Sequence, residues 1–489
     1  MNFLTKNYDK LILVLLLLIY LKLNINLLLV EPPIWPDEAY IADVANNISY
    51  EGRAGTDLWG DTVINIKKSL YWYPPIFVNL LAIWFKVFGL SIINQRFLSV
   101  MIGMLFLVIL YLLGQKIFSE DSCKHKLLSL GLILPIIFDN SFLKASKMGR
   151  PEMMVVLLVF IAIYIYQHLR ESKDKEILYV AIGIILGFAT LTHLVASLFF
   201  LIFLGDFFIF KKEALRNRGF YLLIISYIFS LLPWLISILP NYGIFLQQIS
   251  LQSSFRNLVP SHIESIFRYY PIEQKIIYTL YLFLSGTCFL LLLRKKTLKY
   301  FFLNLGLLAG WFICLEGKLE WYSVYIVSFL YTLVLVIVKS SFKVFSILTF
   351  VLLLTLFFVN IKIYSDSLKF YKDKRDVYFT FGQEIKDKIV QGKTVYLSTT
   401  PDLYFVLKDR NPLYEFPSVQ PIRDKFISLL NDSDYLVINF HLERLFVGNL
   451  LDKYIELNKS REYQIATDNL YQAQIIELVP RNIRKLPKL

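Results

Sequence analysis

Apolar runs of membrane-spanning length recur along the first 363 residues of this 489-residue chain. A helix needs about 20 mostly apolar residues to cross a bilayer, and its backbone polar groups must be satisfied within the protein. We count twelve such segments, at residues 11–30, 76–90, 97–117, 127–145, 151–168, 177–192, 193–210, 219–239, 275–294, 298–316, 319–338 and 342–363. The chain is therefore predicted to be a polytopic α-helical membrane protein.

The charged residues lie mainly between the apolar runs. They make up 18% of the chain, below the roughly 25% typical of soluble domains, and the net charge is +13. Basic residues gather in three connections, at 211–218, 294–299 and 339–343. Short basic loops face the cytoplasm, so the loop at 240–274 and the C-terminal tail are predicted to lie outside. No nucleic-acid-binding motif accompanies the charge, and no nucleic-acid partner is expected.

The first segment orients the N-terminus. Lys6 and Lys10 precede it, Glu31 follows it, and it lacks the short apolar core and small-residue cleavage site of a signal peptide. We therefore predict an uncleaved helix with its N-terminus inside. An inside start and an outside tail require an odd number of crossings, and the segment 76–90 is short for a crossing. About 11–13 transmembrane helices are expected within residues 1–363.

A carboxylate pair follows the first segment directly. Asp37 and Glu38 lie in the predicted first outer loop, residues 31–75, just after Pro36. Apolar residues recur at helical spacing from Asp37 to Tyr50, which predicts a short helix lying along the membrane surface. The loop ends in the sequence YWYPP, where tyrosine and tryptophan favour the headgroup layer and the two prolines stop regular structure.

Residues 364–489 have a different character, with frequent charges and only short apolar runs. KTVYLSTT, DYLVINFH and YQAQIIELV read as strands, and DVYFTFGQEIKDKIVQ and IRDKFISLLND read as amphipathic helices. We predict a small α/β extracytoplasmic domain. The richness of the chain in Ile, Lys, Asn, Phe and Tyr is typical of an AT-rich genome, so the predicted location is a bacterial inner membrane.

Metal-binding and redox motifs are absent from the sequence. The three cysteines are far apart, and no C-x-x-C or H-E-x-x-H spacing occurs. No metal ligand or cofactor is therefore assigned. A divalent ion near Asp37 is left open, although no second set of well-spaced ligands supports it.

Four short motifs follow one another along the membrane region: Trp35-Pro36-Asp37-Glu38-Ala39-Tyr40, Arg96, Arg150-Pro151-Glu152 and Gly317-Lys318-Leu319-Glu320-Trp321-Tyr322. This ordered set, followed by an outer soluble domain, resembles the GT-C glycosyltransferases. The most similar branch contains the protein O-mannosyltransferases and the lipid A aminoarabinose transferase. The resemblance covers most of the membrane region, and the tail resembles the family only in position.

The resemblance implies a GT-C-like fold and a polyprenyl-phosphate-sugar donor. It implies that Asp37 is the family's catalytic acidic residue of the first outer loop, and that Lys318 and Tyr322 lie near the donor phosphate. Arg256, in the loop at 240–274, matches a phosphate-binding arginine. One departure is that the aminoarabinose branch has a lysine where this chain has Pro74.

That departure leaves two readings open: either Lys67 or Lys68 supplies the missing charge, or phosphate binding differs.

The chemistry of such a donor agrees with these residue types. A sugar on a polyprenyl monophosphate departs as a phosphate ester, so the site needs positive charge on the phosphate and a carboxylate for the acceptor proton. A single base opposite the leaving group predicts inversion, because retention uses two closely spaced carboxylates. The candidate catalytic residues are Asp37 and Glu38, and orientation of the loop is the favoured role of Glu38. The candidate phosphate-binding residues are Lys318, Tyr322, Arg256 and Arg150, with Glu152 as a second acidic motif.

Other readings of the same residues stay open. The carboxylate pair is also typical of a solvated helix start, Arg150 and Glu152 of a local ion pair, and Lys318 of a membrane edge. For the whole chain, the alternatives are a multi-helix transporter or lipid flippase with an accessory periplasmic domain, and a non-catalytic scaffold. The expected partners are a polyprenyl-phosphate sugar, membrane lipid, and an acceptor hydroxyl on a lipid, a glycan or a protein.

Overall fold

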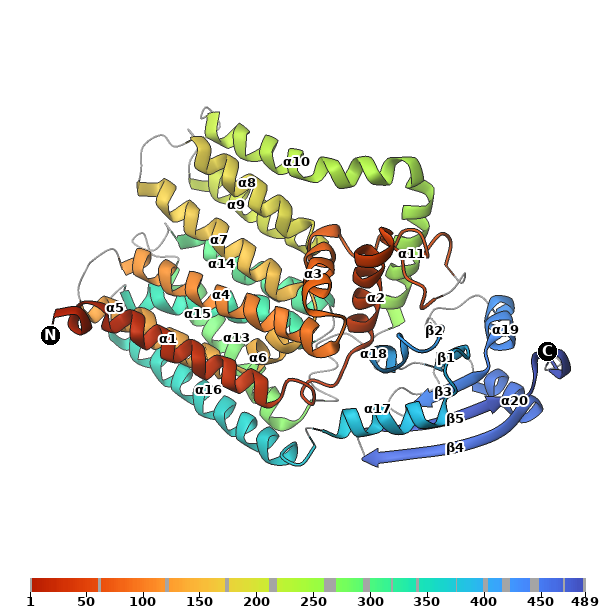
Figure 1. Cartoon of the computed structure of the whole chain (residues 1–489). Helices are drawn as coiled ribbons and strands as arrows, with labels where there is room; N and C mark the ends of the chain where they lie inside the picture. The colour runs from red at the N-terminus through yellow and green to blue at the C-terminus, as the bar shows by residue number, and fades with distance from the viewer. Residues whose placement is uncertain are drawn as a thin grey trace.

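The computed structural model describes residues 2–59, 63–118, 123–171, 176–210, 218–258, 270–292, 300–317, 320–339, 343–374, 376–398, 403–415, 423–439, 448–468 and 471–486. Most of the described part before residue 371 is a helical bundle (Figure 1). Its helices are α1 (Asn2–Asn26), α2 (Pro36–Glu51), α3 (Pro75–Phe88), α4 (Ile92–Phe118), α5 (Cys123–Ile137), α6 (Asn140–Lys147), α7 (Glu152–Glu171), α8 (Glu176–Thr190), α9 (Ser197–Phe210), α10 (Arg218–Ile238), α11 (Tyr242–Leu258), α13 (Ile272–Leu292), α14 (Phe301–Gly317), α15 (Ser323–Lys339) and α16 (Lys343–Phe370). Three short 3₁₀ helices join them: η1 (Leu194–Ala196), η3 (Leu239–Asn241) and η5 (Glu320–Tyr322).

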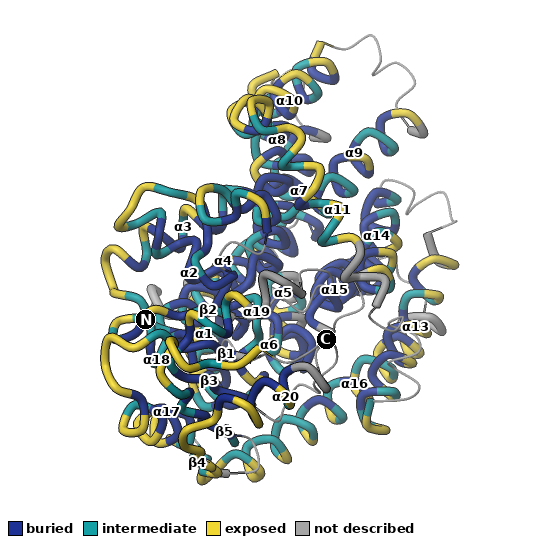
Figure 2. The backbone as a smooth tube through the Cα atoms, turned by 90° about the vertical axis from the view of Figure 1, so that its right-hand side faces the viewer, coloured by how far each residue is buried: buried dark blue, intermediate teal, exposed yellow. Residues whose placement is uncertain are grey.

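The centre and the periphery of the bundle differ in burial (Figure 2). Every side chain of residues 321–337, which include most of α15, is buried. Helix α10 exposes large apolar side chains instead, with Phe229 exposed to 69% and Ile236 to 61%. Apolar helix surfaces of this extent are stable only in an apolar medium. The chain is therefore an integral membrane protein.

Helix length and composition alone identify fewer spans than the sequence predicts. Within the described residues, four helical stretches are long and apolar enough to cross a membrane: Ile92–Phe118, Glu152–Leu169, Arg218–Ser253 and Ile347–Phe370. A bent helix pair raises that number to five, and five further apolar helices are shorter. The number of 11–13 crossings stays a prediction.

The predicted apolar segment at 127–145 is divided into two helices. Helix α5 contains Pro135 and ends at Ile137, and α6 begins at Asn140 with its axis bent by 71°. The carboxylate of Asp139 caps α6 by accepting a hydrogen bond from the Phe142 backbone at 3.1 Å. It also accepts hydrogen bonds from the Tyr281 hydroxyl. A capping residue inside an apolar run starts a new helix. A hydropathy profile does not detect such a helix start.

The predicted helix after Pro36 is confirmed as α2. It ends at Gly52, which adopts the left-handed conformation (φ 69°) common where helices stop. The following loop folds back on itself, since the Leu70 backbone donates to the Ala54 carbonyl at 2.7 Å. Helix α11 packs on this loop through Gln248, whose side-chain oxygen accepts from the Tyr71 backbone at 3.0 Å.

The C-terminal part is a mixed five-stranded sheet of order β2-β1-β3-β5-β4. Strands β1 (Val395–Ser398), β2 (Leu413–Glu415) and β3 (Tyr435–Asn439) are parallel, and β4 (Lys459–Asp468) and β5 (Tyr471–Leu478) are antiparallel. Helices α17 (Val377–Lys388), α18 (Tyr404–Leu407), α19 (Arg423–Asp432) and α20 (Gly448–Asn458), with η7 (Arg481–Ile483), complete it. The three strands and two helices predicted from sequence are confirmed as β1, β3, β5, α17 and α19.

Figure 1 shows this sheet beside α2, with α18 between α2 and the strands. Helix α16 continues to Phe370, past the predicted domain boundary at residue 363, and leads toward α17. The end of the bundle that carries α2 is therefore the end that the C-terminal domain covers.

Candidate functional site

Asp37 lies in the first turn of α2, where Pro36 starts the helix and the helix dipole favours a negative charge. Its Oδ1 accepts a hydrogen bond from the Tyr73 hydroxyl at 3.3 Å, and its Oδ2 is ion-paired with Arg150 Nη1. The side chain of Asp37 stays 30% exposed. The carboxylate is thus oriented by two partners and still accessible.

Arg150 comes from the turn between α6 and α7, and its guanidinium is almost fully buried. Its Nη2 and Nε both donate to Glu152 Oε1, at 2.9 and 3.2 Å. Burial has the largest single effect and would lower the pKa of Arg150, but the charge and hydrogen bond of Glu152, with smaller contributions from Tyr322 and Tyr325, together raise the pKa above its ordinary value. Arg150 is therefore a permanent cation that joins the carboxylates of Asp37 and Glu152.

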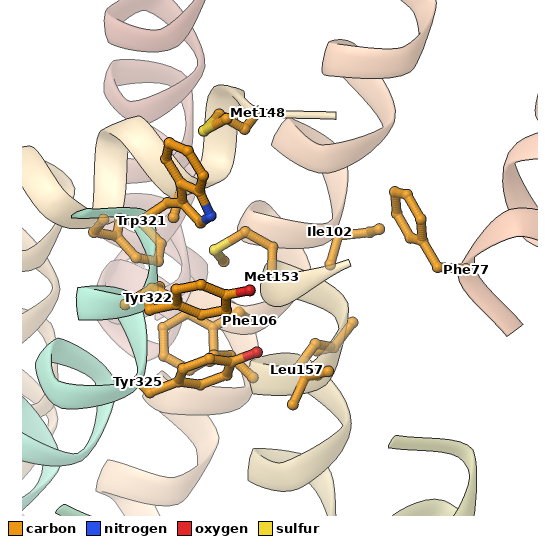
Figure 3. Close-up of a cluster of buried hydrophobic side chains, with 14 of the residues drawn as sticks. Phe77, Ile102, Phe106, Met148, Met153, Leu157, Trp321, Tyr322 and Tyr325 are labelled. Atoms are coloured by element: carbon orange, nitrogen blue, oxygen red, sulfur yellow. The ribbon is translucent and has the colours of Figure 1, made fainter. Parts of the chain in front are cut away.

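Aromatic side chains from η5 and α15, Trp321, Tyr322 and Tyr325, form one wall of a cluster of buried side chains (Figure 3). The guanidinium carbon of Arg150 lies 5.0 Å from the centre of the Trp321 ring, a cation–π contact. Tyr322 and Tyr325 stack with a centroid distance of 6.3 Å. Trp321 Nε1 and the Tyr325 hydroxyl are buried and have no hydrogen-bond partner among the described residues. Buried donors of this kind are normally satisfied, so they mark a place where a polar ligand group would fit.

Glu38 differs from its neighbour Asp37, because it is fully buried and both of its oxygens are engaged. Arg96 Nε donates to Oε1 at 2.9 Å, and Arg96 Nη2 donates to Oε2 at 2.6 Å. The backbone amides of Gly149 and Trp35 add one hydrogen bond each, both of 2.8 Å. Glu38 is therefore inaccessible to a substrate and joins α2 to α4 and to the turn that carries Arg150.

Arg96 extends this network to the end of α1. Its Nη1 donates to the carbonyls of Leu28 and Pro32, at 2.7 and 2.9 Å, and its Nη2 to that of Pro33 at 3.1 Å. The side chain is fully buried, and every guanidinium nitrogen has an acceptor. The chain leading from α1 into α2 is thus held by one arginine.

The turn before Arg150 is pinned by Gln95. The Gln95 side-chain amide donates to the carbonyls of Glu38 and Gly149, at 2.9 and 2.8 Å. A Cβ at Gly149 would lie 2.3 Å from the Gln95 side chain, so only glycine fits beside it. This packing sets the position of Arg150 relative to α2.

The structure brings together Asp37, Glu38, Arg150, Glu152 and Tyr322 among the predicted site residues. Lys318 and the side chain of Arg256 lie outside the described residues. Within the part of the chain that the structure describes, no cluster of three or more His, Cys, Asp or Glu side chains could hold a metal ion. The sequence interpretation gave no role to Gln95, Tyr73 or Tyr325, because single polar or aromatic residues in an apolar chain carry no motif.

The arrangement provides an accessible carboxylate beside a buried cation and unsatisfied aromatic donors. An accessible carboxylate in this position can accept a proton. A cation in low-dielectric surroundings can stabilise the negative charge that develops during a reaction. These are the requirements of group transfer from a phosphate leaving group.

We compared the sequence and the fold of this chain with those of known proteins. Residues 73–236 match the family model for dolichyl-phosphate-mannose-protein mannosyltransferase. An uncharacterized protein of Aquifex aeolicus is 25% identical over 144 residues, which are 29% of this chain. The match spans only 26% of that protein's length.

Two solved structures share the fold. ArnT of Cupriavidus metallidurans, bound to undecaprenyl phosphate, superposes with a TM-score of 0.62 at 14% identity, over 95% of this chain and 97% of ArnT. The archaeal oligosaccharyltransferase AglB of Archaeoglobus fulgidus, in complex with an inhibitory peptide and a dolichol-phosphate, superposes with a TM-score of 0.53 at 12% identity, over 90% of this chain and 70% of AglB. The family match over residues 73–236 and the shared fold support the resemblance to the GT-C superfamily of membrane glycosyltransferases.

Proposed function

We propose that this glycosyltransferase moves a sugar from a polyprenyl-phosphate donor to an acceptor hydroxyl, with inversion at the anomeric carbon. Asp37 is the base, and Arg150 and Tyr322 belong to the donor-phosphate end of the site. Glu152 holds Arg150, and Glu38 positions α2 without contacting substrate. Lys318 and Arg256 supply further positive charge to the phosphate.

The observation that carries this proposal is the contrast in access between two adjacent carboxylates. Asp37 exposes 30% of its side chain, whereas Glu38 exposes none. Only an accessible carboxylate can take a proton from an incoming hydroxyl. The Arg150 guanidinium lies directly beside Asp37, so the base and the positive charge occupy one site.

The reaction needs a single displacement. The acceptor oxygen attacks the anomeric carbon, Asp37 receives the hydroxyl proton, and the bond from that carbon to the phosphate oxygen breaks. The electron pair of that bond leaves with the polyprenyl phosphate, whose second negative charge is stabilised by the nearby cations. In a single displacement the acceptor oxygen attacks from the side of the sugar opposite the departing phosphate, so the product has the inverted configuration.

The donor class is supported by two lines of argument. Both structural relatives were solved with a lipid phosphate of this type. The exposed apolar helices of this chain also favour a donor whose lipid tail lies in the membrane. We propose that the site opens on the outer face of a bacterial inner membrane, under the C-terminal domain, and that the acceptor is a lipid, glycan or protein hydroxyl.

The test uses the full-length protein in proteoliposomes with radiolabelled undecaprenyl phosphate sugars, and membranes from cells lacking the protein as acceptors. Asp37→Asn should lower transfer by about 10²–10⁴-fold, the range for losing a general base. Asp366→Asn, at the exposed end of α16, is the matched control and should transfer like the wild type. If Asp37→Asn transferred sugar at the wild-type rate, Asp37 would not be the catalytic base.

A further inference from the structure

A second buried carboxylate on α2 lies at the contact between the membrane part and the C-terminal domain. Asp43 is less than two helical turns from Asp37 and is fully buried. Its Oδ2 accepts hydrogen bonds from Thr56 Oγ1 and the Asp57 backbone, both at 2.7 Å. Both donors belong to the loop that follows α2, so Oδ2 of Asp43 fixes this loop against α2.

The other oxygen of Asp43 is bound by the C-terminal domain. Oδ1 accepts a hydrogen bond from the Tyr404 hydroxyl at 3.0 Å and pairs with Lys408 Nζ at 2.9 Å. Burial and then the charge of Asp43 raise the pKa of Tyr404 well above its ordinary value, so the hydroxyl keeps its proton and stays a donor. More than 350 residues separate these partners in sequence.

The segment that carries Tyr404 and Lys408 is built rigidly into the C-terminal sheet. Tyr404 and Leu407 of α18 are fully buried. Asn411, just beyond, donates to the carbonyls of Val390 and Lys393, at 2.9 and 2.8 Å, and β2 follows at Leu413. The segment that binds Asp43 is therefore fixed to the chain before β1 and to β2.

The C-terminal domain also touches the chain before α2. The Tyr471 hydroxyl of β5 donates to the Leu29 carbonyl, at the end of α1, at 3.4 Å. Asp37 lies between this contact and Asp43 in sequence, so the domain holds the segment around Asp37 from both sides. Misplacement of a reacting group by about 1 Å can lower a rate by roughly 100-fold.

We infer that Tyr404 and Lys408 are positioning residues for catalysis: by binding Asp43 they fix α2 and hold Asp37 in place. This inference rests on the proposed function of Asp37. It makes the C-terminal domain part of the catalytic apparatus rather than an accessory module.

The experiment compares Tyr404→Phe, Lys408→Met and the double variant with two matched controls inside the C-terminal domain. Tyr454→Phe removes a hydroxyl that donates to Asn431 at 2.8 Å, and Lys459→Met breaks an ion pair with Glu462 at 2.7 Å. The partners of both control residues lie within the C-terminal domain. Transfer kinetics and hydrogen exchange of α2 are measured on the full chain in detergent or proteoliposomes.

We expect kcat to fall about tenfold in each single variant and about 100-fold in the double variant, with donor KM within about twofold of wild type. Exchange at α2 should be at least about tenfold faster, since its anchoring contacts are lost. Lys408→Arg should restore kcat, and the controls should match the wild type. A double variant with wild-type kcat would overturn the inference.

The two proposals fail in different ways. If the wild-type protein transfers none of the sugars offered, the proposed function is in question, and the exchange measurement alone decides whether Tyr404 and Lys408 hold α2. Unchanged exchange in the double variant would then overturn the inference.

Discussion

Two ion pairs flank the start of α2, and they differ in how completely the protein surrounds them. In the Glu38–Arg96 pair neither side chain has any exposed surface, whereas Asp37 in the Asp37–Arg150 pair is 30% exposed. Burying a charge pair carries a large desolvation cost, and the fully buried pair survives because every nitrogen of Arg96 has an acceptor.

This difference in exposure distinguishes a structural ion pair from a catalytic one. A buried ion pair whose hydrogen-bonding groups are all satisfied fixes the positions of the groups around it. The Glu38–Arg96 pair is therefore suited to hold α1, α2 and α4 together. A partly exposed carboxylate can exchange one partner for another, which a proton acceptor must do. Adjacent acidic residues thus serve different purposes, and substitutions at the two pairs should have different signatures.

The largest effect is expected from Arg96→Met. The substitution leaves the buried charge of Glu38 without its partner, and breaking a buried pair in this way costs about 3–5 kcal/mol. The thermal midpoint of the detergent-solubilised protein should fall sharply. Arg96→Met combined with Glu38→Met should recover part of the loss, because no unpaired charge is left. A double variant as unstable as the single one would contradict this account of the pair.

Neutralising Asp37 and Glu38 separately tests whether the two carboxylates differ in their contribution to stability. Glu38→Gln leaves buried donors of Arg96 or Gly149 unsatisfied and should lower the stability by about 1–3 kcal/mol. Asp37→Asn should lower it by about 1 kcal/mol or less, since its ion pair is partly exposed. Thermal unfolding of both variants provides the measurement. Equal losses of stability would show that the two carboxylates are equally structural.

Several elements of this site could be predicted from the sequence. The helical spacing after Pro36 predicted α2. This prediction succeeded because periodicity and proline placement act locally. The three strands identified in the C-terminal part succeeded for the same reason. The grouping of residues near 37, 150 and 320 in one site was implied only by the resemblance to the GT-C glycosyltransferases.

The sequence interpretation favoured an orienting role for Glu38. The groups that hold Glu38, Arg96 and the Gly149 amide, could not be predicted because they are distant in sequence. Strand β4 was missed because its polar sequence, KSREYQIATD, lies at a sheet edge and carries only a weak apolar pattern. The break at Asp139 was missed because a capping carboxylate inside an apolar run becomes visible only with its partner, Tyr281.

A smaller effect is expected from Trp321→Leu, which removes the ring under Arg150. A cation–π contact of this kind contributes about 0.5–2 kcal/mol, so kcat/KM should fall by about twofold to thirtyfold. Trp234→Leu on α10, whose ring lies near Phe245 and not near Arg150, is the control. Unchanged transfer by Trp321→Leu would mean that the aromatic wall does not help to place the cation.

The smallest effect is expected from Tyr73→Phe, which deletes the hydrogen bond to Asp37 Oδ1 and keeps the ring. The bond is long, at 3.3 Å, so its loss should cost about 1 kcal/mol and lower kcat roughly fivefold. Stability should stay close to that of the wild type, because both partners can reach solvent. Tyr71→Phe, in the same loop, controls for the loss of a hydroxyl. If Tyr73→Phe lowered the stability and left kcat unchanged, Asp37 would resemble Glu38, and the contrast between the two pairs would be lost.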